Sequence, residues 1–321
     1  MTRVVQEGAA ATAAPSSPKG RWLTLRRREQ FYRLLFLVPA LVYVLLFYAY
    51  PIFYNFVMSV EHYTLKTYFN GQAPFVGPDN FSHLINHPDF GTAVWNTLVF
   101  TVGSLFFQFT FGLMIAIFFQ RKFPLNATLR ALILIPWLAP VLVSGAVWVR
   151  LLDQDTGVVN FALNTLHITS SNTSWLTDPH LSLISVLIAN IWIGIPFNMV
   201  ILYGGLQSIP GVLYEAASID GANAWQRFRY ITWPLLRPVA TVVLLLGLVY
   251  TLKVFDVIMS ITRGGPANTS QTLNTLAYSL AFTGQLDFGL GAAAGDILIV
   301  IVLAFGLVYL RYAYRELRTV A

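Results

Sequence analysis

The chain has 321 residues, of which 56% are hydrophobic and 11% charged, and its formal net charge is +6 at pH 7. A soluble domain carries about 25% charged residues, so this composition excludes a soluble globular protein and indicates a membrane protein. Because the chain contains no cysteine, disulfide frameworks, thiol nucleophiles and thiolate metal sites are excluded.

Residues 1–30 start with a stretch rich in Ala, Ser and Pro and end in a basic cluster. Such a composition buries too little apolar surface to fold, so we expect 1–30 to be a largely disordered tail. The apolar run from Leu34 would suit a signal peptide, but it continues past Tyr50 and no small-residue cleavage site follows. We therefore expect a first membrane span that is retained.

Six apolar runs are long enough to cross a bilayer, whose hydrocarbon core takes about 20 helical residues. We expect spans at residues 34–58, 92–119, 131–152, 181–203, 239–261 and 288–312. The predicted fold class is an all-α membrane protein, with a six-span domain at 31–312 and a short tail at 313–321. Pro136 and Pro140 should kink the third span, either as a structural bend or beside a pathway through the membrane.

Basic residues gather on one side of these spans. Outside the N-terminal tail they are Arg121, Lys122, Arg130, Arg227, Arg229, Arg237, Arg311, Arg315 and Arg318. The positive-inside rule places that side, with both termini and the segment 204–238, in the cytoplasm. Anionic headgroups account for the charge, so we expect contact with membrane lipid and no nucleic-acid partner.

The segment 215–238 is the longest polar run in the second half of the chain, and apolar runs flank it on both sides. Its opening Glu-Ala-Ala triplet favours a helix that stops at Asp220 and Gly221, because glycine accepts the left-handed conformation at a helix end. A second helical period follows. We predict a helix–turn–helix that stays outside the bilayer.

This segment carries a distinctive sequence motif, since Glu-Ala-Ala at 215–217 is followed by Asp-Gly-Ala at 220–222 and by Phe228. The pattern resembles the EAA loop of binding-protein-dependent ABC importer permeases. It is closest to the carbohydrate permeases related to the maltose transporter. Further runs that resemble this family lie at 129–137, 206–210 and 262–266.

This resemblance implies the type I permease architecture of ABC importers, in a bacterial or archaeal cytoplasmic membrane, and a chain that is not an enzyme. Two ATP-binding partner subunits would carry ATP and Mg²⁺, so no cofactor is expected in this chain. A second homologous permease would complete the pathway, and an extracytoplasmic sugar-binding protein would deliver the substrate. The residues expected to couple to the ATPase are Glu215, Ala216, Ala217, Asp220, Gly221 and Ala222.

Two spans carry candidate substrate contacts. Asn190, Gly194 and Phe197 fall on one stripe of the fourth span; an amide, a bare backbone patch and a ring suit a sugar, and helix packing is the alternative. In the fifth span Lys253 and Asp256 are three residues apart and so on one helical face. There they would meet a substrate or form a structural ion pair.

The resemblance points to Asn190, Gly194, Phe197, Tyr250 and Lys253 as the sugar-binding set. Tyr250 and Lys253 depart from the amides expected at their positions, so the identity of the sugar stays open between mono- and oligosaccharides. A polyol or glycerol phosphate is an alternative substrate. An ATP-independent carrier is an alternative function.

Two residue pairs suggest chemistry only at first sight. His83 and His87 have the spacing of a metal pair, but Pro88 breaks the helix and no third ligand is near. Asp153 and Asp155 have nothing around them that would let them act as acid and base on a glycosidic bond. We expect no metal site and no catalytic residue, and the lack of a phosphate-binding Gly-rich loop indicates that the chain does not hydrolyse ATP.

Overall fold

The structure is a computed structural model that describes residues 32, 35–284 and 286–320, without the side chains of 308, 310 and 312–320. Every regular element in this part of the chain is a helix, apart from two isolated β-bridges. The chain divides into two units, Met1–Tyr54 and Asn55–Ala321, which are described separately. The tail predicted at 1–30 lies outside the described residues.

Five helical runs in the described residues are long and apolar enough to cross a membrane: Leu35–Ser59, Phe90–Phe119, Ser182–Gln207, Ala224–Leu252 and Phe288–Leu307. The first contains a π-helical turn, η1 (Leu45–Ala49), and α2 (Tyr50–Ser59). α5 (Phe90–Phe119), α10 (Ser182–Gln207) and α16 (Phe288–Val320) match three further predicted spans, and α16 continues beyond 312. The predicted all-α membrane fold is confirmed.

The third predicted span, 131–152, is a bent pair of helices that is apolar enough to count as a sixth span, and the kink predicted at Pro140 is confirmed. α6 (Asn126–Ile133) and α7 (Ile135–Leu138) form one arm, α8 (Val141–Leu151) forms the other, and the arms are bent by 96°. Pro140 explains the break, because its ring disfavours helical geometry at the preceding residue and it lacks an amide hydrogen. Ala139 is accordingly extended, with φ −70° and ψ 141°.

The fifth predicted span, 239–261, is wrong at both ends. The helix starts earlier, because α12 (Ala224–Arg227), a π-helical turn η2 (Phe228–Thr232) and α13 (Trp233–Leu252) form one continuous run. It stops at Leu252, and α14 (Asp256–Ile261) begins after Phe255, whose φ of −130° is not helical. Lys253 and Asp256 therefore do not share a helical face, since the helix that would align them is interrupted.

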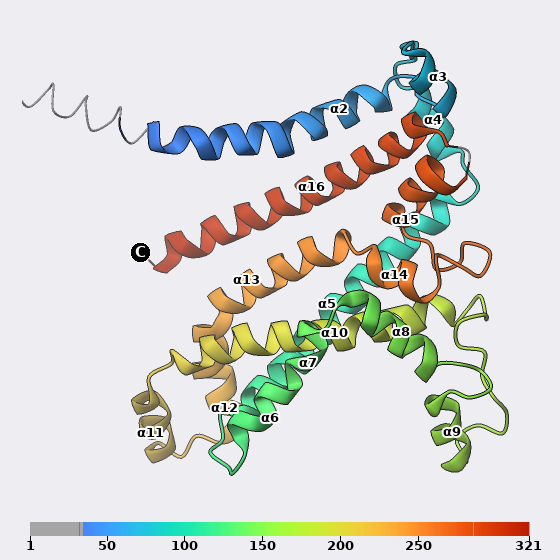
Figure 1. Cartoon of the computed structure of the whole chain (residues 1–321). Coiled ribbons are helices and arrows are strands. Elements are labelled where there is room, and N and C mark those ends of the chain that lie inside the picture. The colour runs from blue at the N-terminus through green and yellow to red at the C-terminus, as the bar shows by residue number, and fades with distance from the viewer. Residues whose placement is uncertain (1–31, 33–34, 285, 321) are drawn as a thin grey trace, which may run out of the picture. The chain divides into compact units, whose positions relative to one another are not determined.

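The segment 204–238 forms the predicted helix–turn–helix, at the end of α10 and α13 opposite α14 and α15 (Figure 1). α11 (Gly211–Ile219) ends at Asp220, and Gly221 is left-handed with φ +75°. Asn223 then caps α12 by accepting a hydrogen bond from the Gln226 amide at 2.9 Å. The stop predicted from the Asp-Gly pair is confirmed.

α5 and α10 are packed side by side, and small residues allow their close approach. A Cβ on Gly112 of α5 would lie 2.6 Å from Asn198 Cβ, and one on Gly194 of α10 would lie 2.3 Å from Gln108 Cδ. One buried apolar cluster joins α5, α10 and α13 near the helix–turn–helix, and a second joins α4, α5, α15 and α16. This core holds α10 and α13 in fixed positions beside each other.

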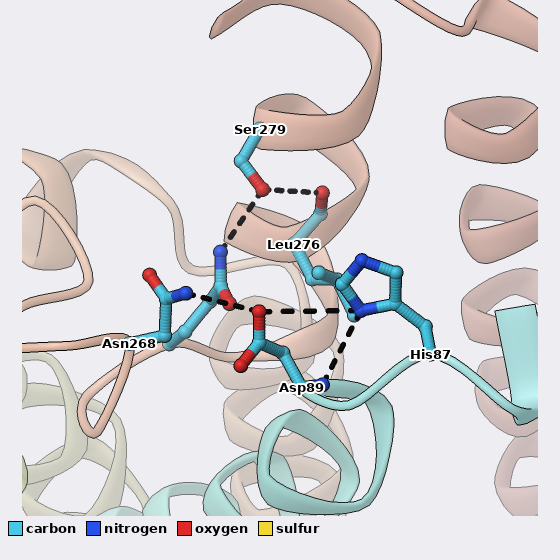
Figure 2. A network of polar contacts seen from close by, with 6 residues as sticks. His87, Asp89, Asn268, Leu276 and Ser279 are labelled. Carbon is cyan, nitrogen blue, oxygen red and sulfur yellow. Dashed lines mark hydrogen bonds and ion pairs between the residues drawn. The ribbon is translucent and has the colours of Figure 1, made fainter. Parts of the chain in front are cut away.

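The opposite end of the spans carries short helices and turns: α3 (Leu65–Asn70), α4 (Asp79–Ile85), α9 (Val158–Thr165), α15 (Leu273–Tyr278) and the π-helical turn η3 (Ser279–Thr283). Polar contacts tie the start of α5 to the loop before α15. Figure 2 shows Asn268 donating to Asp89 Oδ2 at 2.9 Å, beside His87. The Asn96 amide donates to the carbonyls of Thr269 and Gln271, each at 2.8 Å.

Candidate functional site

One cavity brings together all five residues predicted to contact substrate: Asn190, Gly194, Phe197, Tyr250 and Lys253. Its volume is about 580 Å³, within the range of roughly 300–1,000 Å³ typical of ligand sites. α5, α7, α10 and α13 supply its walls, together with residues at the break between α13 and α14. The cavity thus lies where both broken spans are interrupted.

The α10 wall combines packing with exposure to the cavity. Asn190 is only 6% exposed, and its amide donates to Ser104 Oγ at 2.8 Å. The Gln108 side-chain amide donates to the backbone carbonyl of Asn190 at 2.9 Å. It also occupies the space that a side chain at Gly194 would need. Asn190 and Gly194 therefore take part in helix packing as well as lining the cavity, and the Asn190 side-chain nitrogen already donates a hydrogen bond.

Aromatic rings form the second wall. The Trp137 and Phe197 ring centroids are 5.8 Å apart, and Phe197 meets Tyr250 at 5.8 Å with planes inclined by 79°. The Lys253 ammonium lies 4.9 Å from the Tyr250 ring centroid, which is within cation–π range. Tyr250 is 53% exposed, so its ring remains accessible to a ligand.

Lys253 and Asp256 border the cavity from the helix break. The ion pair considered for them is not formed in the described part of the chain, where Lys253 contacts the ring of Tyr250. The Lys253 carbonyl accepts a hydrogen bond from the Asn274 amide at 2.9 Å, which fixes the backbone at the end of α13. Lys253 thus reaches the cavity from the end of α13, and Asp256 from the first residue of α14.

The lining residues that the sequence analysis missed include Gln108 and Trp137. Gln108 is an amide in the middle of the long apolar helix α5, and Trp137 follows Pro136 next to the bend. An amide in the middle of a span and an aromatic residue at a kink are signals that could have found them. With them, the cavity presents ring faces and hydrogen-bonding groups, which suits a ligand with apolar faces and hydroxylated edges.

The residues predicted to couple to the ATPase lie together on the helix–turn–helix. Glu215 and Ala216 are exposed on α11, and Ala217 is partly buried. The residues from Asp220 to Ala222 form the turn: Asp220 caps α11, Gly221 is left-handed and exposed, and Ala222 is partly buried.

Side-chain contacts hold the two helices of this segment together. The hydroxyl groups of Tyr214 and Thr232 are 2.9 Å apart, and Arg227 Nη1 donates to Ser218 Oγ at 3.0 Å. Ile219 is nevertheless 87% exposed.

The His and Asp pairs take part in local structure. His83 lies in α4, whereas His87 lies beyond its end and accepts a hydrogen bond from the Asp89 amide. No group of three or more metal-ligand side chains occurs among the described residues. Hydrogen bonds from the amide and hydroxyl of Thr156 lower the pKa of Asp153, which caps the turn after α8.

Known proteins are similar to this chain in sequence and in fold. Residues 108–315 match the family described as binding-protein-dependent transport system inner membrane component. The chain is 34% identical to the trehalose/maltose transport system permease protein MalF of Thermococcus litoralis, over 89% of this chain and 95% of that protein.

The fold is similar to that of a solved bacterial ABC transporter involved in the import of the acidic polysaccharide alginate. The TM-score is 0.77 at 25% identity, covering 92% of this chain and 98% of that one. A structure of the bacterial alginate transporter in complex with an alginate pentasaccharide-bound periplasmic protein matches with a TM-score of 0.75 at 25% identity, covering 93% and 97%.

The helical membrane fold, the helix–turn–helix at 204–238 and these matches agree with the resemblance carried by the Glu-Ala-Ala and Asp-Gly-Ala spelling. The relative is a transport system permease protein, and the family is described as an inner membrane component, in agreement with a transport subunit. The chain belongs to the family of binding-protein-dependent transport system inner membrane components, the permeases of ABC importers.

Proposed function

We propose that the chain is the permease subunit of an ATP-driven sugar importer and forms half of its translocation pathway. The substrate is a mono- or oligosaccharide held against Asn190, Gly194, Phe197, Tyr250 and Lys253. The observation that carries this proposal is the cavity in which these five residues meet. The names of similar proteins support a sugar, since one refers to trehalose and maltose and another to alginate.

The helix–turn–helix would be the surface that contacts the ATP-binding subunits. Two ATP-binding subunits, which carry ATP and Mg²⁺, would bind the segment 215–238 and its equivalent on a second homologous permease. An extracytoplasmic sugar-binding protein would deliver the substrate, and the similar alginate transporter has been solved with such a protein. Both termini would lie in the cytoplasm, in agreement with the distribution of Lys and Arg.

Alternating access would follow from closure of the two ATPases. Closure would bring the coupling segments together and open the cavity outwards, and hydrolysis would reverse the movement. The run from Ala224 to Leu252 supports this mechanism, because it connects the coupling segment to Tyr250 without a break. Displacement of α12 is therefore transmitted along α13 to the wall of the cavity.

A polyol or glycerol phosphate remains the second candidate substrate. Lys253 favours it, since its ammonium reaches the cavity and would attract an anionic group. Uptake of labelled disaccharides, an alginate oligosaccharide and glycerol phosphate by the assembled transporter in proteoliposomes separates these substrates. Each must be supplied with the cognate binding protein.

Two variants test the cavity. Tyr250→Ala and Phe197→Ala should each lower substrate uptake about tenfold, because a lost ring contact of about 1.4 kcal/mol corresponds to that factor. Phe106→Ala is the matched control, since Phe106 is an exposed aromatic residue of α5 outside the cavity. Wild-type uptake by both cavity variants would contradict the proposed site.

The coupling role has its own test. Glu215→Lys and Gly221→Pro should abolish substrate-stimulated ATP hydrolysis while the subunit still inserts and assembles, with Val212→Ala on the same helix as the control. Undiminished transport by both variants would contradict the coupling role. Sugar flux through liposomes that contain this chain alone would instead favour an ATP-independent carrier.

A further inference from the structure

A second cavity, separate from the candidate substrate cavity, lies between α5, α6, α7 and α10. Its volume is about 830 Å³, and its lining includes Met114, Phe118, Leu132, Trp192 and Pro196. Trp192 follows Asn190 by two positions, and Pro196 follows Gly194 by two. Each therefore lies about 200° around α10 from that substrate-cavity residue. The two cavities therefore open on different faces of the same helix.

The lining of this second cavity is entirely apolar apart from the indole of Trp192 and backbone groups. Apolar cavities do not hold ordered water, because water there finds no hydrogen-bond partners. A bilayer surrounds these helices, and its acyl chains are as apolar as the lining. The occupant that fits the lining is therefore a hydrocarbon chain.

Basic residues lie at the end of this cavity that is nearer the helix–turn–helix. The Arg130 guanidinium lies 4.5 Å from the Tyr203 ring centroid, and Tyr203 is on the face of Pro196, two turns further along α10. Lys122 is exposed just after the end of α5, three residues beyond the lining residue Phe119. Neither cation forms an ion pair within the described residues.

We infer that this cavity binds one acyl chain of an anionic phospholipid, with the headgroup at Lys122 and Arg130. The acyl chain alone provides no preference among lipids, since it moves from the hydrocarbon of the bilayer into the equally apolar cavity. The two cations provide it, because each basic residue near the membrane surface favours an anionic lipid by a factor of about five. Together they favour it by roughly twenty-five-fold over a zwitterionic lipid of the same chains.

Photocrosslinking with lipids tests this site in the assembled transporter. Phosphatidylglycerol with a diazirine in one acyl chain is incorporated at low mole fraction into nanodiscs that hold the complete complex. Adducts are mapped to peptides by mass spectrometry, and diazirine phosphatidylcholine provides the comparison. We expect adducts of phosphatidylglycerol at 114–119 and 129–136, at least tenfold above those of phosphatidylcholine.

Two variants separate the charge from the cavity. Lys122→Gln combined with Arg130→Gln should reduce the phosphatidylglycerol adducts to the phosphatidylcholine level, whereas Lys66→Gln, at an exposed lysine of α3, should not. Leu132→Trp narrows the cavity and should remove adducts of both lipids at these peptides. Val102→Trp, at an exposed position of α5 outside the cavity, should leave them unchanged.

Three results would overturn the inference. Equal labelling by the two lipids in the wild-type transporter would show that the cations select nothing. Absence of adducts at 114–119 and 129–136 would show that a protein segment, not a lipid, covers the cavity. Unchanged labelling in the Leu132→Trp variant would show that the lipid lies outside it.

Discussion

Gly194→Ala tests how α5 and α10 hold the wall of the candidate substrate cavity. A Cβ at position 194 would lie 2.3 Å from Gln108 Cδ and 2.4 Å from its Nε2, whereas non-bonded carbon atoms prefer about 3.5–4.0 Å. The Gln108 amide must therefore move by more than about 1 Å. That movement breaks its 2.9 Å hydrogen bond to the Asn190 carbonyl.

The expected cost follows from this bond. Leaving a buried amide unpaired costs about 1–3 kcal/mol of the free energy of unfolding, while alanine stabilises a helix by about 0.5–1 kcal/mol relative to glycine. Gly204→Ala on the same helix is the matched control, because nothing lies within 4 Å of its Cβ. Gly204→Ala should show only the stabilising effect of alanine in a helix. The free energy of unfolding of Gly194→Ala should therefore be lower than that of Gly204→Ala by about 1–3 kcal/mol.

Both variants are unfolded in mixed micelles of increasing SDS fraction and followed by tryptophan fluorescence. Uptake by the assembled transporter is measured in parallel, since a displaced Gln108 also alters the cavity. The Gly194→Ala midpoint should lie below the wild-type midpoint or close to it, and the Gly204→Ala midpoint above it. Equal midpoints for the two variants would refute the steric argument.

Three further predictions concern a second close helix contact, a buried hydrogen bond and the pH dependence of a turn. Gly112→Ala should cost about 1–3 kcal/mol in the same unfolding assay, because its Cβ would meet Asn198 Cβ at 2.6 Å on a neighbouring helix; an unchanged midpoint would contradict this. Asn55→Ala should cost about 1–3 kcal/mol, since the Asn55 amide donates to the buried Asp296 carboxyl at 2.8 Å, and wild-type stability would show that this bond contributes nothing. Hydrogen bonds from Thr156 lower the pKa of Asp153 from 3.8, so the turn they close should be stable above that pH and open as the pH falls through the lower folded-state pKa. Hydrogen exchange of the Thr156 amide measures this, and an Asp153→Asn variant that keeps the pH dependence would contradict it.

The stripe Asn190, Gly194 and Phe197 was predictable because the period of one helix aligns these residues, whatever surrounds them. The stop at Gly221 was predictable for a similar reason, since the conformational freedom of glycine is a local property. Such predictions need no information about how one helix packs on another.

The kink in the third span was predictable from Pro140, whereas the break after α13 was not. No proline or glycine marks 253–255, and apolar residues continue on both sides of Lys253, although the helical hydrogen bonds of α13 stop there. Gln108 was missed because its place in the cavity depends on the packing of α5 against α10. That packing is a tertiary property, and no spacing along the chain encodes it.

Under the proposed coupling, the continuous run Ala224–Leu252 would act as a lever. It has 29 residues, including a π-helical turn and Pro238, and at 1.5 Å per residue its path is about 44 Å long. A tilt of about 10° around its midpoint swings each end through about 4 Å, in opposite directions. In the proposed cycle, a displacement of a few ångströms at the coupling segment would therefore move the cavity wall at Tyr250 by a comparable distance.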